Sequence, residues 1–224
     1  MKGYSFDRSQ LAPPSHTPTL PGIEFDRVPA VLAGVDEVGR GPLAGPVVSA
    51  AVILSHDAPL IRGLADSKAL TAAERDRLFA HITRRAVASA VSIVENEVID
   101  SVNILRASLQ SMRECLQALR IRPDLVLIDG NQKPGSGFPE RTIIKGDSLS
   151  AAIMAASILA KVTRDRIMVE AHDRFPMYGF NKHKGYACKS HIEALREHGP
   201  CPLHRLSFDP VRSWISDSVE LLST

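Results

Sequence analysis

The sequence predicts an α/β protein built on a mixed five-stranded sheet flanked by helices, with a helical C-terminal part. Two observations support this fold class. After an opening pair of apolar strands, segments with strand character alternate with segments of helical periodicity. Beyond about residue 148 the patterning is helical and is interrupted only by glycine and proline. The length of 224 residues is sufficient for one sizeable core.

Composition divides the chain into three parts. Residues 1–28 carry four prolines among scattered polar residues and hold no lasting period of 2 or 3.6, so we expect a mostly disordered tail. Residues 29–172 contain the alternating strands and helices and are expected to form the core. Residues 173–224 are expected to form a helical extension that packs on this core.

Five segments have strand character. The first two are apolar runs joined by a glycine- and proline-rich turn, and this short connection favours an antiparallel pair. The third alternates in polarity, the fourth is a short apolar run (LVLI) followed by Asp-Gly, and the fifth follows a Gly/Pro loop. The expected strands cover residues 30–36, 47–54, 86–95, 125–128 and 141–145.

Three longer helices are expected between and after these strands. Thr71 and Glu74 have the spacing of a capping box, which predicts a helix that begins at residue 72. Apolar residues at helical spacing between Val102 and Leu116, among them Leu105, predict an amphipathic helix whose stripe faces the core. The expected helices cover residues 72–85, 101–119 and 148–172.

The composition is that of an ordinary globular protein, with 44% hydrophobic and 23% charged residues and a net charge of +2. The three cysteines form no CxxC pair, which is typical of a reducing compartment, and the N-terminus lacks a signal-peptide pattern. The strongest apolar run, residues 151–160, is too short to span a bilayer. We therefore expect a soluble, cytoplasmic protein without a membrane segment.

Positive charge is concentrated toward the C-terminal end. Between Lys161 and Arg205 nine Lys/Arg stand against five Asp/Glu, and five of the eight histidines lie there. Such a bias is either the footprint for a polyanion or the solvated surface of helices. Charge alone favours the second interpretation.

Four acidic residues stand where predicted strands end or a helix begins: Asp36 and Glu37 after the first strand, Asp129 after the fourth, and Asp147 before the long helix. If the first and fourth strands are parallel neighbours, their ends meet at one sheet edge, where open α/β sheets bind ligands. Clustered carboxylates need cations, and hard oxygen ligands suit Mg²⁺ or Mn²⁺. Each acid also has a local explanation, as a strand end, an Asp-Gly turn or a helix cap.

Several blocks of sequence, in this order and spacing, resemble bacterial ribonuclease HII, the type 2 ribonuclease H family. The resemblance extends over roughly residues 30–212, nearly all of the chain expected to be structured. The blocks are residues 34–47 (GVDEVGRGPLAGPV), 66–68 (DSK), 128–130 (IDG), 145–147 (KGD), 155–165 (AASILAKVTRD), 178–180 (YGF), 183–186 (HKGY) and His191.

The resemblance implies a ribonuclease-H-like fold with a helical C-terminal extension. It further implies an endonuclease that cuts the RNA strand of RNA–DNA hybrids and incises DNA duplexes 5′ to an embedded ribonucleotide, leaving a 3′-hydroxyl and a 5′-phosphate. Asp36, Glu37, Asp129 and Asp147 would be the catalytic carboxylates and would hold two Mn²⁺ or Mg²⁺ ions during phosphodiester hydrolysis. We expect a monomer.

The same resemblance assigns the substrate contacts. Gly39, Arg40, Gly41 and Tyr186 would sense the junction between ribose and deoxyribose. Physical chemistry is consistent with this, because glycines allow the backbone to approach the 2′-hydroxyl by which proteins distinguish RNA from DNA. The predicted substrate-binding residues are Gly39, Arg40, Gly41, Lys68, Lys145, His183, Lys184 and Tyr186, with Lys161 and Lys182 as further phosphate contacts. Two positions depart from the family pattern, Cys188 and Met154.

A zinc site is an alternative for part of the C-terminal segment. Cys188 with His191, and Cys201 with His204, have the spacing of a Cys₂His₂ site. The family resemblance argues against it, because its pattern includes the histidines but does not need the cysteines.

Two other functions compete with a type 2 ribonuclease H. A nucleic-acid-binding protein on the same fold would keep the basic segment and lack one acid, whereas all four acids are present. A junction resolvase or type 1 ribonuclease H would share the carboxylates but would not need the glycine-flanked Arg40 together with Tyr186. Cleavage at a single ribonucleotide distinguishes these possibilities.

Overall fold

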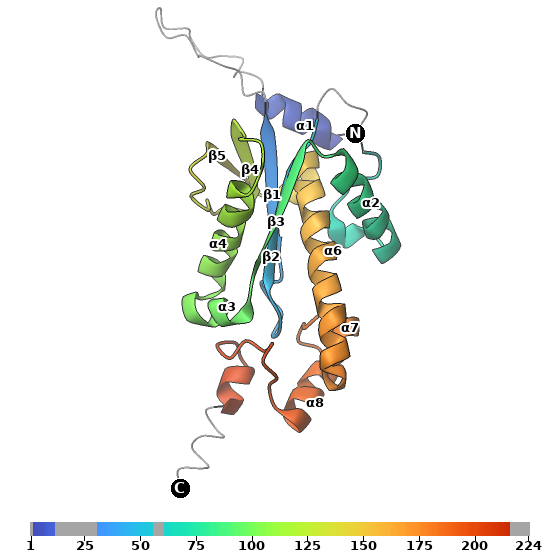
Figure 1. Cartoon of the computed structure of the whole chain (residues 1–224), viewed down its shortest axis with the longest axis vertical. Coiled ribbons are helices and arrows are strands. Elements are labelled where there is room, and N and C mark those ends of the chain that lie inside the picture. The colour runs from blue at the N-terminus through green and yellow to red at the C-terminus, as the bar shows by residue number, and fades with distance from the viewer. Residues whose placement is uncertain (1, 12–30, 56–60, 216–224) are drawn as a thin grey trace, which may run out of the picture.

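A mixed five-stranded sheet with the order β3-β2-β1-β4-β5 forms the centre of the molecule (Figure 1). The computed structural model describes residues 2–11, 31–55 and 61–215. The predicted hairpin is confirmed, since β1 and β2 are antiparallel, as are β2 and β3, while β4 lies parallel to both β1 and β5. The strands are β1 Leu32–Val38, β2 Val47–Ile53, β3 Ala88–Val94, β4 Leu125–Asp129 and β5 Glu140–Ile143.

Helices cover both faces of the sheet, which explains why β1 and β2 are apolar runs without strict alternation. On one face, Val48, Ala50 and Val52 of β2 pack in a cluster with α2 and α6. On the other face, Ala51 and Ile53 pack in a cluster that contains residues of α4. The covering helices are α2 Ala72–Arg85, α4 Ile104–Gln117 and α6 Ala151–Arg174. The capping box predicted at the start of α2 is present.

The helix predicted over residues 101–119 is instead two helices, α3 Asn96–Val102 and α4. Asn103 separates them with a left-handed φ of 71°, and its side chain accepts a hydrogen bond from the Arg106 N–H. Asparagine tolerates this conformation and is a good N-cap, so the break has a local cause. The expected apolar stripe was wrong at Leu105, which is 40% exposed.

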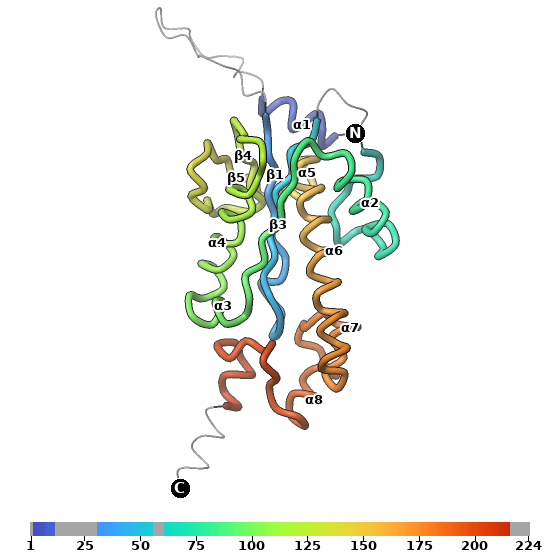
Figure 2. Tube along the Cα trace, viewed as in Figure 1, coloured from blue at the N-terminus to red at the C-terminus, as the bar shows by residue number. Residues whose placement is uncertain are grey.

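The C-terminal part contains helices, as predicted, although residues 199–210 form turns and irregular structure. The long helix of the sequence prediction is split by a cap at Ser150 into α5 Gly146–Leu149 and α6. Figure 2 shows the last described segment crossing below the ends of β1 and β2. Although α6 has 24 residues, no helix in the described ranges is both long and apolar enough to cross a membrane. The remaining helices are α7 Phe180–His183 and α8 Lys189–His198, with short 3₁₀ turns η1 Ser67–Ala69 and η2 Pro176–Tyr178.

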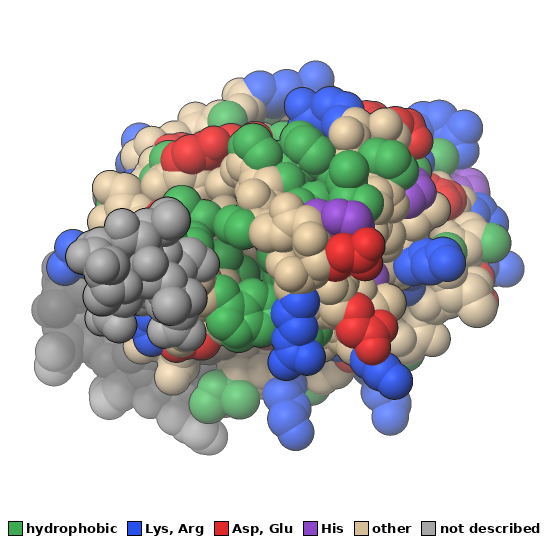
Figure 3. All heavy atoms as spheres, turned by 90° about the horizontal axis from the view of Figure 1, so that it is seen from below, with side chains coloured by type: hydrophobic (Ala, Val, Ile, Leu, Met, Phe, Trp, Pro, Cys, Tyr) green, Lys and Arg blue, Asp and Glu red, His purple; other side chains and the backbone are tan. Residues whose placement is uncertain are grey.

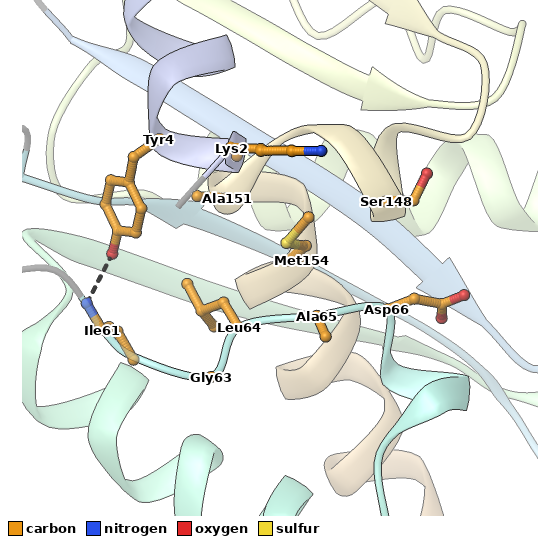
Figure 4. A pocket seen from close by; sticks show the side chains of 11 residues that line it. Lys2, Tyr4, Ile61, Gly63, Leu64, Ala65, Asp66, Ser148, Ala151 and Met154 are labelled. Atoms are coloured by element: carbon orange, nitrogen blue, oxygen red, sulfur yellow. Dashed lines mark hydrogen bonds between the residues drawn. The ribbon is translucent and has the colours of Figure 1, made fainter.

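The prediction of a disordered tail over residues 1–28 was wrong at its start, where Lys2–Leu11 form the helix α1. Tyr4 is buried and its hydroxyl accepts a hydrogen bond from the Ile61 N–H at 3.1 Å (Figure 4). Asp7 is also buried, and its Oδ2 accepts from the Ala152 N–H at 2.9 Å, at the N-terminus of α6. Tertiary contacts thus stabilise a helix that its polar sequence does not predict. The rest of the segment lies outside the described residues.

Candidate active site

Two neighbouring parallel strands bring the first three carboxylates together. Val35 of β1 is paired with Ile128 of β4, so the next residues, Asp36 and Asp129, lie side by side. Glu37 follows on β1. Parallel pairing of the two strands is the condition that the sequence prediction set, and the structure satisfies it.

The fourth carboxylate reaches the same place from α5. The Asp147 N–H donates to Asp129 Oδ1 at 3.3 Å. Lys145 precedes this helix in a left-handed conformation, with φ 57°, and Gly146 follows it without a side chain. A Cβ on Gly146 would lie 3.2 Å from Asp129 Oδ1 and 2.5 Å from Ile153 Cδ1. The close approach of α5 to β4 therefore requires glycine at this position.

The carboxylates have unusual proton affinity. Burial, together with repulsion from Glu37 and Asp129, raises the pKa of Asp36 well above its ordinary value. Burial also raises the pKa of Glu37, against the opposing effect of Arg40. Burial and the charge of Asp147 raise the pKa of Asp129. All three shifts have the sign expected where added positive charge would be stabilising.

Two cations partly neutralise the cluster. Lys68 Nζ lies 3.2 Å from Asp147 Oδ2, and Arg40 Nη1 lies 3.3 Å from Glu37 Oε1. The Lys68 side chain is 80% exposed and that of Arg40 50%, so both pairs are screened and contribute little to stability. Both cations thus remain largely exposed while each is paired with a carboxylate.

The donor set fits divalent cations, since four carboxylates supply hard oxygen ligands and an excess of negative charge. Within the described residues, no three His, Cys, Asp or Glu side chains already converge on one point. The carboxylates therefore flank one another without forming a closed cage. Such an open arrangement leaves room for substrate oxygens among the ligands.

The sequence prediction missed the buried residues that form hydrogen bonds next to the carboxylates. A hydrogen bond from Ser157 of α6 partly offsets the raised pKa of Asp36. The Ser157 Oγ is 2.9 Å from Ser67 Oγ, and both serines are buried. Arg75 of α2 donates to the carbonyl of Ser67 at 3.0 Å. These hydrogen bonds fix the position of the 3₁₀ turn that carries Lys68. Ser67 and Ser157 lie inside the family blocks, but nothing in their spacing shows that they meet.

A second missed feature is a pair of buried arginines beneath the loop of residues 39–46, called here the 39–46 loop. Arg164 of α6 and Arg205 of the C-terminal segment are both fully buried. Their guanidinium groups donate hydrogen bonds to backbone carbonyls of this loop. From the sequence, both arginines are indistinguishable from the other basic residues of the C-terminal region.

Tyr186, the predicted junction sensor, lies next to the 39–46 loop. Tyr186 is 42% exposed, and a Cβ built on Gly41 would lie 3.8 Å from its ring. The predicted partners Gly41 and Tyr186 are thus brought together. Arg40 lies beside them, within reach of Glu37.

The remaining predicted contacts are less directly connected to the carboxylates. Lys145 is exposed just before Asp147. Both ring nitrogens of His183 are used by backbone groups, the Tyr178 carbonyl at 2.7 Å and the Gly185 N–H at 3.2 Å, which favours a packing role. Lys184 donates to the Asn181 carbonyl, and Lys161 pairs with Asp165 at 2.7 Å.

Of the four residues considered as an alternative zinc site, the two histidines form a hydrogen-bonded pair instead. His204 Nδ1 accepts from the Cys201 N–H at 2.9 Å, so its proton is on Nε2, which lies 3.0 Å from His191 Nε2. His191 then carries its proton on Nδ1 and donates to the Tyr186 carbonyl at 2.9 Å. All four ring nitrogens are engaged, and Cys188 contacts Ser190 Oγ at 3.2 Å. This arrangement argues against the zinc alternative.

The charge bias of the C-terminal third does not produce one continuous basic patch at its end of the molecule. Figure 3 shows this end from below, with Lys and Arg side chains mainly around the rim and hydrophobic side chains across much of the middle. The basic residues near the carboxylates come instead from separate elements, Lys68 from η1 and Arg40 from the 39–46 loop.

Comparisons with a family model and with individual relatives agree on one protein family. The family model for ribonuclease HII matches residues 33–211. A ribonuclease HII of Burkholderia thailandensis is 52% identical over 192 residues, which cover 86% of this chain and 89% of that protein.

Solved structures extend the similarity to the fold. The ribonuclease H2 of Pyrococcus horikoshii superposes with a TM-score of 0.71 at 26% identity, covering 84% of this chain and 98% of the other. Bst-RNase HIII, solved in complex with Mn²⁺, superposes with a TM-score of 0.63 at 19% identity, covering 85% of this chain and 70% of the other. The α1 helix precedes the residues that the family model matches.

Proposed function

The chain belongs to the ribonuclease HII family, and we propose that it incises duplex DNA on the 5′ side of an embedded ribonucleotide. Membership makes the protein a metal-dependent ribonuclease that cleaves the RNA strand of RNA–DNA hybrids. The finer activity is supported by one observation above all, the placement of Gly41 and Tyr186 next to each other beside the carboxylates.

The carboxylates would hold the divalent cations. We assign Asp36, Glu37 and Asp129 as direct ligands, with Asp147 completing a second site. Two Mg²⁺ or Mn²⁺ ions bound there would supply an activated water and stabilise the leaving 3′ oxygen. The raised pKa of Asp36 supports this assignment, because a bound cation replaces the proton that burial otherwise favours.

The neighbouring side chains orient the substrate. Lys68 holds Asp147 at 3.2 Å and is exposed enough to contact a phosphate of the cleaved strand. Arg40 can exchange its exposed contact with Glu37 for a phosphate oxygen. The Gly41 backbone faces open space in which a 2′-hydroxyl can approach, and the Tyr186 ring borders that space. The Tyr186 ring would leave no room for a 2′-oxygen on the next nucleotide downstream of the ribonucleotide. The site would therefore favour deoxyribose at that position.

The protein would act as a monomer in the cytoplasm, in the repair of ribonucleotides left in DNA. The three cysteines, Cys115, Cys188 and Cys201, are unpaired thiols, as expected in a reducing compartment. Light scattering at micromolar concentration tests the monomer; a doubled mass would contradict it.

The experiment uses a labelled DNA duplex with one ribonucleotide, incubated with Mg²⁺, Mn²⁺ or EDTA. We expect a single incision 5′ to the ribonucleotide that EDTA and Asp36→Asn abolish. Asp76→Asn is the matched control, because Asp76 is an exposed carboxylate paired with Arg166 on the surface. Cleavage of long hybrids without incision at the single ribonucleotide would refute the junction-sensing roles of Arg40 and Tyr186. Cleavage of neither substrate would favour a protein that only binds nucleic acid.

A further inference from the structure

We infer that Arg164 and Arg205 are positioning residues that hold the 39–46 loop from inside, so that its outward N–H groups read the ribose. The inference rests on the proposed function and adds that ribose selectivity depends on two residues that do not touch the substrate. It also gives the C-terminal extension a part in specificity, because Arg205 belongs to that extension.

Arg205 binds the loop through its whole guanidinium group. Nη2 donates to the carbonyls of Gly39 at 2.5 Å and Gly45 at 2.8 Å, Nη1 to that of Arg40 at 3.0 Å, and Nε to that of Gly45 at 3.0 Å. The backbone adds to this contact, since the Arg205 N–H donates to the Leu43 carbonyl at 2.8 Å. Both arms of the loop are thereby tied to one side chain.

Arg164 holds the loop from α6 and connects it to Tyr186. It donates to the carbonyls of Pro46 at 2.9 Å, Ala44 at 3.0 Å and Lys184 at 3.0 Å. Its guanidinium carbon lies 5.9 Å from the centre of the Tyr186 ring. One buried side chain therefore sets the position of both predicted sensing elements relative to each other.

The positive charges of the two guanidinium groups are stabilised by the dipoles of backbone carbonyl groups. Among the ion pairs of the described residues, neither Arg164 nor Arg205 has a carboxylate partner. Burial lowers the pKa of Arg164 to about 10 and that of Arg205 to about 9, so both stay protonated at neutral pH. Buried charges satisfied mainly by carbonyls of this loop make its conformation costly to change, since a displaced carbonyl leaves a charge unsolvated.

Inward carbonyls direct the loop's N–H groups outward. In a planar trans peptide the C=O of one residue and the N–H of the next point in opposite directions. Because the carbonyls of Gly39 and Arg40 face Arg205, the N–H groups of Arg40 and Gly41 point away from it. No acceptor within the described part of the chain pairs with either N–H. Successive outward N–H groups form a concave site for an oxygen ligand.

Gly39 and Gly41 consequently have different roles in the loop. A Cβ on Gly39, where φ is +98°, would lie 2.3 Å from Arg164 Nε, so this glycine makes room for the buried arginine. A Cβ on Gly41 would meet nothing nearer than the Tyr186 ring at 3.8 Å. The sequence interpretation gave both glycines to the substrate, and the structure leaves only Gly41 facing outward.

Arg205→Lys tests the inference, because lysine keeps the charge but lacks the fork that binds four carbonyls, those of Gly39, Arg40, Gly45 and Pro46. We expect kcat at a single embedded ribonucleotide to fall about 100-fold, the scale of lost orientation at a reacting centre, with a smaller change in KM. An RNA–DNA hybrid offers a ribonucleotide in every register and is expected to lose about tenfold or less. Arg166→Lys, a substitution of an exposed arginine on α6, is the matched control and should change neither rate.

Gly41→Ala provides the second variant, since it alters the outward side of the loop and leaves both arginines in place. It should show the same loss of selectivity at an unchanged melting temperature. Equal losses on both substrates for Arg205→Lys, or full selectivity in both variants, would overturn the inference. Wild-type protein that fails at the single ribonucleotide would instead refute the proposed function before any variant is compared.

Discussion

Acidification from about pH 7.5 to pH 5 is expected to destabilise the protein through the buried His191–His204 pair. Each ring nitrogen of this pair already donates or accepts one hydrogen bond. A further proton on either ring would face another N–H group and would leave a charge in a site with 1% exposure or less. The folded protein therefore resists protonation that the unfolded chain accepts.

The size of this loss of stability follows from the difference between the histidine pKa values in the folded and the unfolded protein. Burial lowers the pKa of both histidines to about 4, from an ordinary value of 6.5. Since the unfolded chain binds these protons first, stability falls as the pH drops through 6.5 toward 4. At pH 5 each histidine removes roughly 2 kcal/mol from the free energy of unfolding. The pair together removes a substantial part of the 5–15 kcal/mol of a typical domain.

Urea unfolding of wild type and of His191→Gln/His204→Gln at both pH values measures this contribution. The raised pKa values of Asp36 and Glu37 act in the opposite direction, so the histidine effect is the difference between the two proteins. The double variant should be less stable at pH 7.5 but should lose roughly 4 kcal/mol less on acidification. His81→Gln, on the exposed side of α2, is the control. Equal acid losses in wild type and double variant would refute the reasoning.

Four further substitutions have defined outcomes. Thr71→Ala removes the capping box of α2 and should cost about 1 kcal/mol in urea unfolding; an unchanged midpoint would contradict the role of the cap. Tyr4→Phe removes the hydroxyl that binds the Ile61 N–H and should cost about 1 kcal/mol in the same assay, whereas no loss would mean that α1 is held without it. Gly34→Ala would place a Cβ 2.3 Å from the Ala152 carbonyl carbon, so circular dichroism should show loss of the native fold, and a native spectrum would contradict this close packing. Asp36→Asn should abolish cleavage while filter binding of an RNA–DNA hybrid persists; residual turnover near the wild-type rate would refute its role as a ligand.

Features with a local cause were predictable from the sequence. The capping box at Thr71 and the strand end at Asp129 depend on a few neighbouring residues, and the structure has both. The meeting of Asp36 with Asp129 followed from one topological condition, parallel strands, that the alternation of strands and helices favours. Asp147 was predicted from its place before the long helix, and the family blocks added the predicted substrate contacts.

Features that depend on distant contacts were missed. The α1 helix is stabilised by Asp7 at the N-terminus of α6 and by Tyr4 in the core, and neither contact leaves a periodic signal. Arg164 and Arg205 are missed because charged residues are expected on the surface, and only the fold shows the carbonyls that receive them. Leu105 was expected in the core because the stripe was counted through a helix that Asn103 interrupts.

The hydrogen bonds between Arg205 and the 39–46 loop join two parts of the chain that are synthesised far apart in time. The strands and α5, which carry the four acids, precede Arg205 in the chain and are therefore synthesised first. The loop at Gly39 is then present but has no guanidinium to close upon. Until Arg205 arrives, the nascent chain has acids without a fixed ribose-reading surface. The inferred ribose selectivity therefore depends on a residue that is synthesised after all four acids.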